Sequence, residues 1–216
     1  CLVHTGEYFA HPLSGGIVPL TSVPALARPK ENQWHRFHWP GSKRLLKASY
    51  LLAMKYSIRE ATAADLEDVL ALNQSEVPHV GSITMTEMSD FLIIASYFRV
   101  VRNDHGDLLA SLIGLGPNAA YASLNYRWFD ERYQRFAYID RIAVAADTRR
   151  QGIAEALYKD FEHQSGKQAE WLCCEVNLVP ENPVSMAFHQ RLGFKQVGTL
   201  EAANSAKKVA LLIRAC

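Results

Sequence analysis

The sequence has few cysteines, almost no net charge and no long apolar run, and each of these absences excludes a class of protein. Four of its 216 residues are cysteines, with no C-x-x-C spacing, so a disulfide framework and a structural zinc site are both disfavoured. The formal net charge of +1 provides no field that would attract nucleic acid. No run of eighteen apolar residues is found, which argues against a membrane span. Because sparse cysteines suit a reducing cytosol, we expect a cytoplasmic protein. From the cysteine spacing, the net charge and the lack of a long apolar run, we expect no metal site, no nucleic-acid partner and no membrane partner.

Residues 1–53 differ in composition from the rest of the chain. They hold five of the nine prolines, four of the eight histidines and only two acidic residues. Neither helical nor strand periodicity is easy to find before Leu45, whereas Met54 stands directly before a strand-like start. We therefore expect one folded domain over 54–216, and we expect the first 53 residues to be disordered or upstream read-through.

From Met54 onward, turn residues and changes of hydrophobic period delimit the predicted helices and strands. In chain order, the pattern predicts a strand at 56–59, helices at 66–73 and 88–95, strands at 97–102, 108–115 and 136–144, a helix at 152–164, a strand at 171–178, a helix at 182–192, and strands near 194–200 and 208–214. The order β-α-α-β-β-β-α-β-α-β-β predicts an α/β fold with a mixed sheet flanked by helices.

A basic turn follows the predicted strand that ends at Val144. It reads Arg149, Arg150, Gln151, Gly152, Ile153 and Ala154. Because Ile153, Leu157 and Phe161 then share one helical face, the turn lies at a helix N-terminus. The free N–H groups and positive dipole there favour an anion such as a pyrophosphate, and the two arginines can add charge-assisted bonds. Taken alone, the turn is equally compatible with a capped helix and two solvated arginines.

A second block, about thirty residues further along, reads N-P-V-S-M-A-F-H-Q-R-L-G-F over 182–194. Asn182 can cap a helix, Pro183 suits its first turn, and Gly193 suits its end. The two blocks at this separation resemble the GNAT superfamily of acyl-CoA N-acyltransferases, over about 56–216. Residues 125–129 with 188–189 are also similar to a group of small bacterial GNAT proteins of unassigned substrate. The resemblance implies a GNAT-like fold whose central, mostly antiparallel sheet has about seven strands.

The resemblance also implies where acetyl-CoA, the cosubstrate, would bind. The basic turn would hold its pyrophosphate through backbone amides, and the preceding strand would pair with its pantetheine arm. One strand amide would polarise the thioester carbonyl. In the second block, Asn182 would contact the cofactor, cap the helix, or do both, and Ser185 would be small enough to let the cofactor pass. The implied contacts are Ile142, Ala143, Val144, Arg149, Arg150, Gln151, Gly152, Ile153, Ala154, Asn182 and Ser185.

Three residues are candidates for proton transfer. His189 occupies a position where many GNAT proteins have the tyrosine that protonates the departing thiolate, so it is the candidate acid; the alternative is a half-exposed histidine without this role. Glu175 and Asp140, on the strands before the two blocks, are the candidate bases. Either carboxylate could instead be structural, and Asp140 could pair with Arg141 or Arg127.

The segment of about twenty residues before the strand at 136–144 is long for a connection and rich in aromatic residues. We interpret it as a loop that walls the acceptor pocket, although its rings could instead cover the sheet edge. Tyr126 and Trp128 from this loop, and Asn177 on the same strand face as Glu175, are the expected acceptor contacts.

The resemblance implies an N-acetyltransferase that moves an acetyl group from acetyl-CoA to a primary amine by direct transfer in a ternary complex, without a metal. The acceptor, either a small molecule or a protein amine, stays open, as do the length of the acyl group and a homodimer. One alternative is a non-catalytic acyl-CoA-binding or sensing domain, and another is an interaction domain that keeps only the fold.

Overall fold

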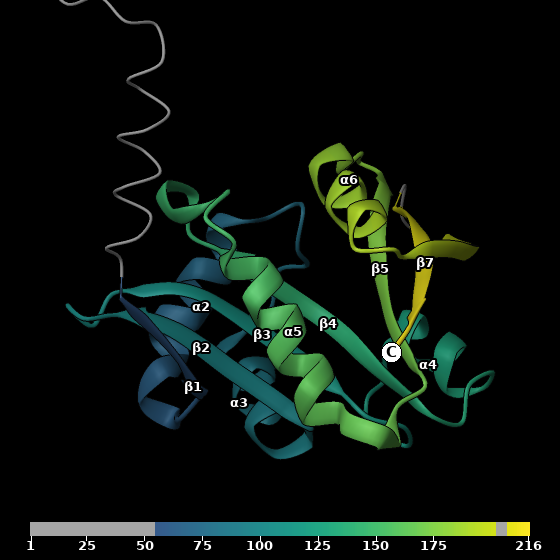
Figure 1. Cartoon of the computed structure of the whole chain (residues 1–216), viewed down its shortest axis with the longest axis horizontal. Helices are drawn as coiled ribbons and strands as arrows, with labels where there is room; N and C mark the ends of the chain where they lie inside the picture. The colour runs from purple at the N-terminus through teal and green to yellow at the C-terminus, as the bar shows by residue number, and fades with distance from the viewer. Residues whose placement is uncertain (1–54, 202–206) are drawn as a thin grey trace, which may run out of the picture. The chain divides into compact units, whose positions relative to one another are not determined.

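The computed structural model describes residues 55–201 and 207–216, and the statements that follow concern these residues (Figure 1). The prediction made for residues 1–53, and for a domain start at Met54, lies outside them. The described elements are β1 (Tyr56–Glu60), η1 (Ala63–Asp65), α2 (Leu66–Ser75), α3 (Met85–Ile94), β2 (Tyr97–Asn103), β3 (Leu108–Leu115), α4 (Leu124–Asp130), β4 (Phe136–Val144), η2 (Ala146–Thr148), α5 (Ile153–Ser165), η3 (Gly166–Gln168), β5 (Trp171–Val179), α6 (Pro183–Arg191), β6 (Lys195–Glu201) and β7 (Lys208–Ala215).

The strands form one sheet in the order β1-β2-β3-β4-β5-β7-β6. Every neighbouring pair is antiparallel except β4 and β5, which are parallel. A parallel pair needs a crossover connection, and α5 supplies it here. The structure thus confirms the predicted mixed, mostly antiparallel seven-stranded sheet.

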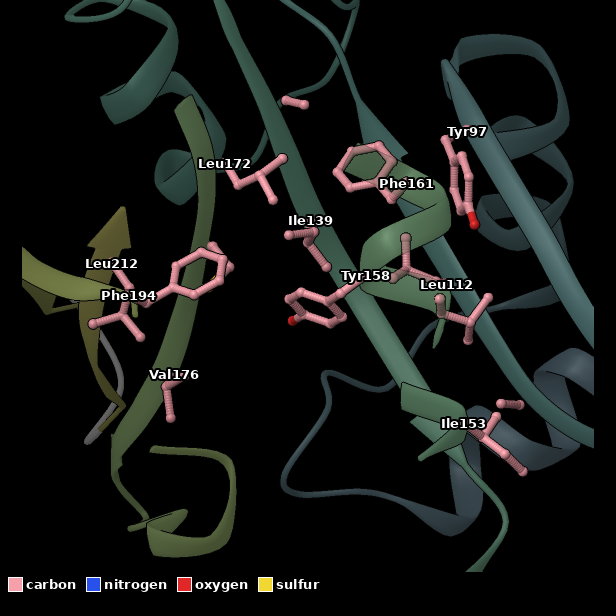
Figure 2. Close-up of a cluster of buried hydrophobic side chains, with 14 of the residues drawn as sticks. Tyr97, Leu112, Ile139, Ile153, Tyr158, Phe161, Leu172, Val176, Phe194 and Leu212 are labelled. Carbon is pink, nitrogen blue, oxygen red and sulfur yellow. The ribbon is translucent and has the colours of Figure 1, made fainter. Parts of the chain in front are cut away.

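Helices cover both faces of this sheet, and each face has its own apolar core. On one face, the α5 residues Leu157, Tyr158 and Phe161 pack with Phe194 and with residues of the central strands (Figure 2). On the other face, α2, α3 and α4 contribute the buried residues Leu66, Val69, Met88, Phe91, Tyr126 and Phe129. Strand residues alternate between the two cores, as Val100 and Val101 of β2 do, because successive side chains of a strand point to opposite faces.

The segment between β3 and β4 corrects one prediction. We expected a loop, but it contains α4, whose N-cap Ser123 accepts a hydrogen bond from the backbone of Tyr126. The aromatic residues Tyr126, Phe129 and Tyr133 follow one another at helical spacing and pack on the sheet. Burial of these rings stabilises a short helix that local sequence signals alone do not specify.

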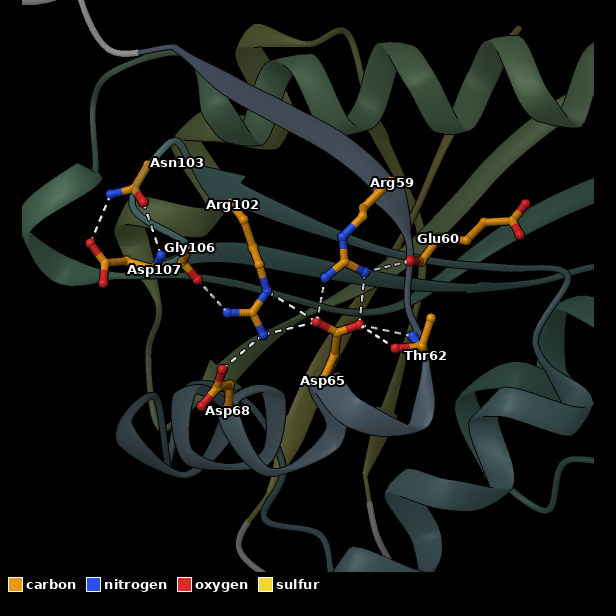
Figure 3. A network of polar contacts seen from close by, with 9 residues as sticks. All are labelled: Arg59, Glu60, Thr62, Asp65, Asp68, Arg102, Asn103, Gly106 and Asp107. Carbon is orange, nitrogen blue, oxygen red and sulfur yellow. Dashed lines mark hydrogen bonds and ion pairs between the residues drawn. The ribbon is translucent and has the colours of Figure 1, made fainter.

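An ion-pair network fastens β1 and β2 to the start of α2 (Figure 3). The buried carboxylate of Asp65 accepts two bonds from Arg59, at 2.7 and 2.8 Å, and two from Arg102, at 2.8 and 3.0 Å. It also accepts from the backbone and hydroxyl of Thr62, which forms a capping box with it. These bonds, that from Arg59 above all, hold the pKa of Asp65 well below its usual range. The network therefore joins the edge strand β1 and its neighbour β2 to the start of α2.

Candidate functional site

The central strands β4 and β5 separate halfway along their length. They pair from Phe136 and Trp171 to Ile139 and Cys174, and no pairing follows, although β4 continues to Val144. On their outer sides, β3 stays paired with β4 and β7 with β5, so both strands keep their shape where they part. Figure 1 shows the two ribbons diverging toward the end of β5 that leads into α6. Backbone groups of β4 beyond Ile139 therefore face an opening instead of a neighbouring strand.

A cavity of about 230 Å³ occupies this opening. Strands β4 and β5, helices α5 and α6, and the segment between α2 and α3 contribute to its walls. Its lining comprises His79, Val80, Gly81, Tyr121, Ser123, Asn125, Ile139, Asp140, Arg141, Ile142, Tyr158, Cys174, Glu175, Val176, Asn177, Asn182, Ser185, His189 and Lys207. All three candidates for proton transfer, His189, Glu175 and Asp140, are thus brought to one cavity.

Glu175 lies on the cavity wall just beyond the last paired residues. The Tyr138 hydroxyl donates to its Oε2 at 2.6 Å, and the Asn125 amide donates to its Oε1 at 3.0 Å. Burial raises the pKa of Glu175 to about 7, and the negative charge of Asp140 adds to this, while the bonds from Tyr138 and Asn125 oppose it. A carboxyl group with this pKa exchanges protons near neutral pH.

Asp140 is held differently. Its side chain is 4% exposed and forms an ion pair with Arg141, with Nε 2.7 Å from Oδ2. Arg141 also donates to Asn73, and its guanidinium lies over the ring of Phe91. The pairing with Arg141, one of the two partners considered from the sequence, makes Asp140 part of a fixed ion pair. The two candidate bases therefore differ in their contacts, since Asp140 pairs with a cation whereas Glu175 accepts from the neutral side chains of Tyr138 and Asn125.

His189 is 3% exposed, so it is not the half-exposed histidine considered as an alternative. Its Nδ1 lies 2.8 Å from the backbone carbonyl oxygen of Ser185, and its Nε2 lies 2.7 Å from the hydroxyl of Tyr158 on α5. Burial lowers the pKa of the ring. Sequence analysis did not identify Tyr158 as a site residue, because it lies next to the apolar stripe of α5 and its partner comes from another helix.

The basic turn leads into α5 in the way the sequence predicts. Gly152 has a φ of 82° and is the N-cap, and Arg150 also has a left-handed φ, of 61°. A Cβ at Gly152 would have no heavy atom within 4 Å, so the backbone conformation, and not a lack of space, favours glycine here. Arg149 donates to the carbonyl of Val144 and pairs with Glu76 at the end of α2. Gln151 donates to the backbone of Asp147, which closes the turn.

The other implied cofactor residues lie on both sides of the opening. Ile142, Asn182 and Ser185 line the cavity. Asn182 also caps α6 by accepting from the backbone of Ser185 at 3.1 Å, so it is both a cap and a wall residue. Ala143 and the side chain of Ile153 are buried in the core, so only their backbone groups are suited to contact a ligand. The remaining members, Val144 and Ala154, are partly exposed at the end of β4 and in the first turn of α5.

The three expected acceptor residues have other partners. Tyr126 is 1% exposed and its hydroxyl bonds the backbone of Gly116 and Ala119, so it is not among the residues that line the cavity. Trp128 is not among them either, since it packs against Gly198 of β6. Asn177 does line the cavity, but its amide donates to the carbonyls of Pro78 and His79.

The aromatic residues of 121–133 thus mainly pack on one face of the sheet, whereas the alternative noted from the sequence was a cover over its edge. Tyr121 lines the cavity, as do the polar residues Ser123 and Asn125. From the residue order alone, neither the burial of Tyr126 nor the packing of Trp128 is visible, because both depend on where α4 lies on the sheet.

Over 55–201 and 207–216, no helix combines the length and apolar character required to cross a bilayer. Within the same part of the chain, no three His, Cys, Asp or Glu side chains gather in a way that could hold a metal ion.

Comparison with known proteins gives a consistent result. Residues 72–194 match the family described as "Acetyltransferase (GNAT) family". No curated protein matches the chain. Among solved structures, Ard1 from Thermoplasma volcanium is similar with a TM-score of 0.60 and 21% identity, over 74% of this chain and 97% of that one.

Two further solved structures cover the same share of this chain, 74%. Naa20 from Chaetomium thermophilum, in complex with a bisubstrate analogue, has a TM-score of 0.58 and 18% identity, over 86% of that chain. The ribosomal-protein-S18-alanine N-acetyltransferase from Escherichia coli has a TM-score of 0.56 and 17% identity, over 94% of that chain. At these identities the structural likeness establishes the fold.

Proposed function

The chain belongs to the acetyltransferase (GNAT) family, and from that premise we propose that it transfers an acetyl group from acetyl-CoA to the nitrogen of a primary amine. Both substrates would be bound together, and the amine would attack the thioester directly. The observation that carries the proposal is the opening between β4 and β5, where Glu175 and an unpaired strand edge line one cavity.

The residues around the opening suit acetyl-CoA. The free edge of β4, at Ile142, Ala143 and Val144, offers backbone groups to the pantetheine amides, and one of its N–H groups could polarise the thioester carbonyl. The first N–H groups of α5, preceded by the left-handed Gly152, suit the pyrophosphate. Acetyl-CoA itself supplies the activated acetyl group. Arg149 would exchange its pairing with Glu76 for a phosphate oxygen.

Glu175 would act on the amine. A primary amine is mostly an ammonium ion near neutral pH, so a proton must leave before the nitrogen can attack. With a pKa of about 7, the carboxyl group of Glu175 is partly ionised at this pH and can take that proton directly or through a water molecule. Asp140 would remain paired with Arg141 and contribute a fixed charge to the cavity.

Two measurements on the full chain test this function. Calorimetry with acetyl-CoA measures donor binding, and thiol release with a panel of amines measures transfer. We expect both, and we expect Glu175→Gln to reduce kcat about 10²-fold while leaving the Kd of acetyl-CoA unchanged. Glu170→Gln, at an exposed acid of an ion pair with Arg135, is the matched control and should behave as wild type.

The outcomes separate the possible readings of the site. Binding without thiol release from any amine would replace the proposal with a non-catalytic acyl-CoA-binding domain. Absence of binding would overturn the donor site as well, and would leave only the fold in common with the family.

A further inference from the structure

A tyrosine and a histidine from two different helices meet at the wall of the cavity. Tyr158 comes from α5 and His189 from α6, both are almost fully buried, and both line the cavity. The Tyr158 oxygen lies 2.7 Å from Nε2 of His189. Figure 2 shows the Tyr158 ring between the ribbons of β4 and β5, with its hydroxyl directed toward β5. The pair is therefore located where the two strands part.

The hydrogen bonds indicate which member of the pair carries the available proton. Nδ1 of His189 lies 2.8 Å from the carbonyl oxygen of Ser185, and a carbonyl oxygen can only accept. Nδ1 therefore bears the proton of the ring. Burial disfavours the doubly protonated form, so Nε2 is an acceptor and the Tyr158 hydroxyl donates to it. In this tautomer His189 has no N–H left to offer to a group in the cavity.

Aromatic packing restricts how either side chain can move. The Tyr158 ring has edge-to-face contacts with Phe188, His189 and Phe194, with centroids 5.3, 5.6 and 6.1 Å apart. His189 is in turn packed against Phe188 and Phe194. The Tyr158 oxygen is therefore kept at one place in the cavity, and rotation of its O–H about the Cζ–O bond turns the proton from His189 toward a group in the cavity.

We infer that Tyr158 is the proton donor to the departing thiolate, and that His189 is a positioning residue that orients the Tyr158 hydroxyl. This assignment rests on the proposed acetyl transfer. It moves the acid role that the sequence suggested for His189 onto a residue of the facing helix. Burial raises the pKa of the Cys174 thiol and that of the Tyr158 hydroxyl well above their usual ranges, so in this cavity a coenzyme thiolate would be a stronger base, and the phenol a weaker acid, than in water.

Every proton that is transferred during acetyl transfer can be accounted for. As the tetrahedral intermediate collapses, the C–S bond breaks, its electron pair stays on sulfur, and the sulfur takes the Tyr158 proton. The phenolate left behind regains a proton from water as the products leave. The attacking nitrogen loses two protons in becoming an amide, both through Glu175 to solvent. Because one proton returns to Tyr158, each turnover releases one proton.

Kinetics of three variants in the full chain test the assignment. Tyr158→Phe keeps the ring and should lower kcat by about 10²-fold, the usual size of a general-acid effect. The Kd of acetyl-CoA, measured by calorimetry, should stay within about twofold and reports that the variant is folded. His189→Gln keeps an acceptor for the hydroxyl and should retain most of the activity, whereas His189→Phe should lose about tenfold. Tyr56→Phe, at an exposed tyrosine of β1, is the control for the same atom change.

A second measurement does not depend on turnover. In ¹⁵N NMR of the labelled full chain, His189, identified from the signals that disappear in His189→Gln, should be neutral with its proton on Nδ1. A proton on Nε2 would overturn the role given to His189, because the ring would then donate to the Tyr158 oxygen instead of accepting from it. An unchanged kcat in Tyr158→Phe, or a loss in His189→Gln as large as in Tyr158→Phe, would overturn the assignment. A wild-type protein that binds acetyl-CoA but acetylates no amine would instead overturn the proposed function.

Discussion

Tyr138 donates a hydrogen bond of 2.6 Å to Glu175 beside the last paired residues of β4 and β5. The two side chains come from neighbouring strands: Tyr138 is one residue before the last paired residue of β4, and Glu175 is one residue after the last paired residue of β5. This places the carboxyl group against protein on one side and against the cavity on the other. Burial and the charge of Asp140 raise the pKa of Glu175 to about 7, while Tyr138 limits that rise. The relationship leads directly to two predictions.

The first prediction concerns the pH dependence of transfer. If Glu175 removes the amine proton, kcat/KM should rise with pH with a midpoint near 7. The Tyr138 bond stabilises the ionised carboxylate, so Tyr138→Phe should raise the pKa of Glu175 and move the midpoint to higher pH by about one unit. A pH profile of thiol release checks this, with Tyr56→Phe as the control. A midpoint that does not move would separate Glu175 from the observed titration.

The second prediction concerns stability. Because the folded-state pKa of Glu175 is above its unfolded value of about 4.5, its contribution to stability is fully present below pH 4.5 and is lost as pH rises through about 7. Glu175→Gln lacks this loss. Its stability relative to wild type should therefore increase between pH 4.5 and pH 8, by about 1–3 kcal/mol.

Urea unfolding at both pH values measures this difference. Glu170→Gln, at an exposed acid, should show almost none of it. A difference that is the same at both pH values would mean that the pKa of Glu175 is not raised in the folded state.

The third prediction concerns the network at the sheet edge. Asp65 is 2% exposed and accepts from both Arg59 and Arg102, so Asp65→Asn should destabilise the fold by about 2–4 kcal/mol at pH 7. The folded-state pKa of Asp65 is depressed, so this stabilisation is present above the unfolded value near 3.8 and is lost as pH falls through the folded value.

Denaturant unfolding at pH 7 and pH 3 measures both effects, and the gap between wild type and Asp65→Asn should narrow at pH 3. Asp68→Asn removes a 57% exposed partner of the same Arg102 and should cost less than about 1 kcal/mol. An equally large loss in Asp68→Asn would argue against a special role for the buried carboxylate.

The fourth prediction concerns the contact between α5 and β3. A Cβ added at Gly114 would lie 2.5 Å from two ring atoms of Phe161, so Gly114→Ala should destabilise the protein by about 1–3 kcal/mol. Gly116→Ala, whose Cβ would meet only Ser96 at 3.8 Å, is the matched control. Thermal unfolding of each variant, and of Gly114→Ala combined with Phe161→Leu, gives the result. If the smaller Leu side chain failed to recover stability, the clash with the ring would not be the cause.

Element positions could be predicted from the sequence because their signals are local. The hydrophobic period, the turn residues at 103–106 and the cap at Asn182 each act within a few residues of the chain. For the same reason, the basic turn before α5 and the block at 182–194 were visible without a structure. The exception is α4, a helix of the structure that the sequence did not predict. Its stability comes from rings buried on the sheet, and burial is not a local property.

What the sequence by itself determined is the family, the arrangement of helices and strands, and the segments that flank the opening. Only the tertiary structure decided which candidate residues line one cavity and which groups each of them contacts. It pairs Asp140 with Arg141, places Glu175 beside Tyr138, removes Tyr126 and Trp128 from the cavity, and brings Tyr158 against His189. The physical reason is that pKa values, tautomers and access to a cavity depend on neighbours far away in the chain. Tyr138 and Asn125 lie 37 and 50 residues from Glu175 in sequence, and Tyr158 lies 31 residues from His189, beyond the reach of any local pattern.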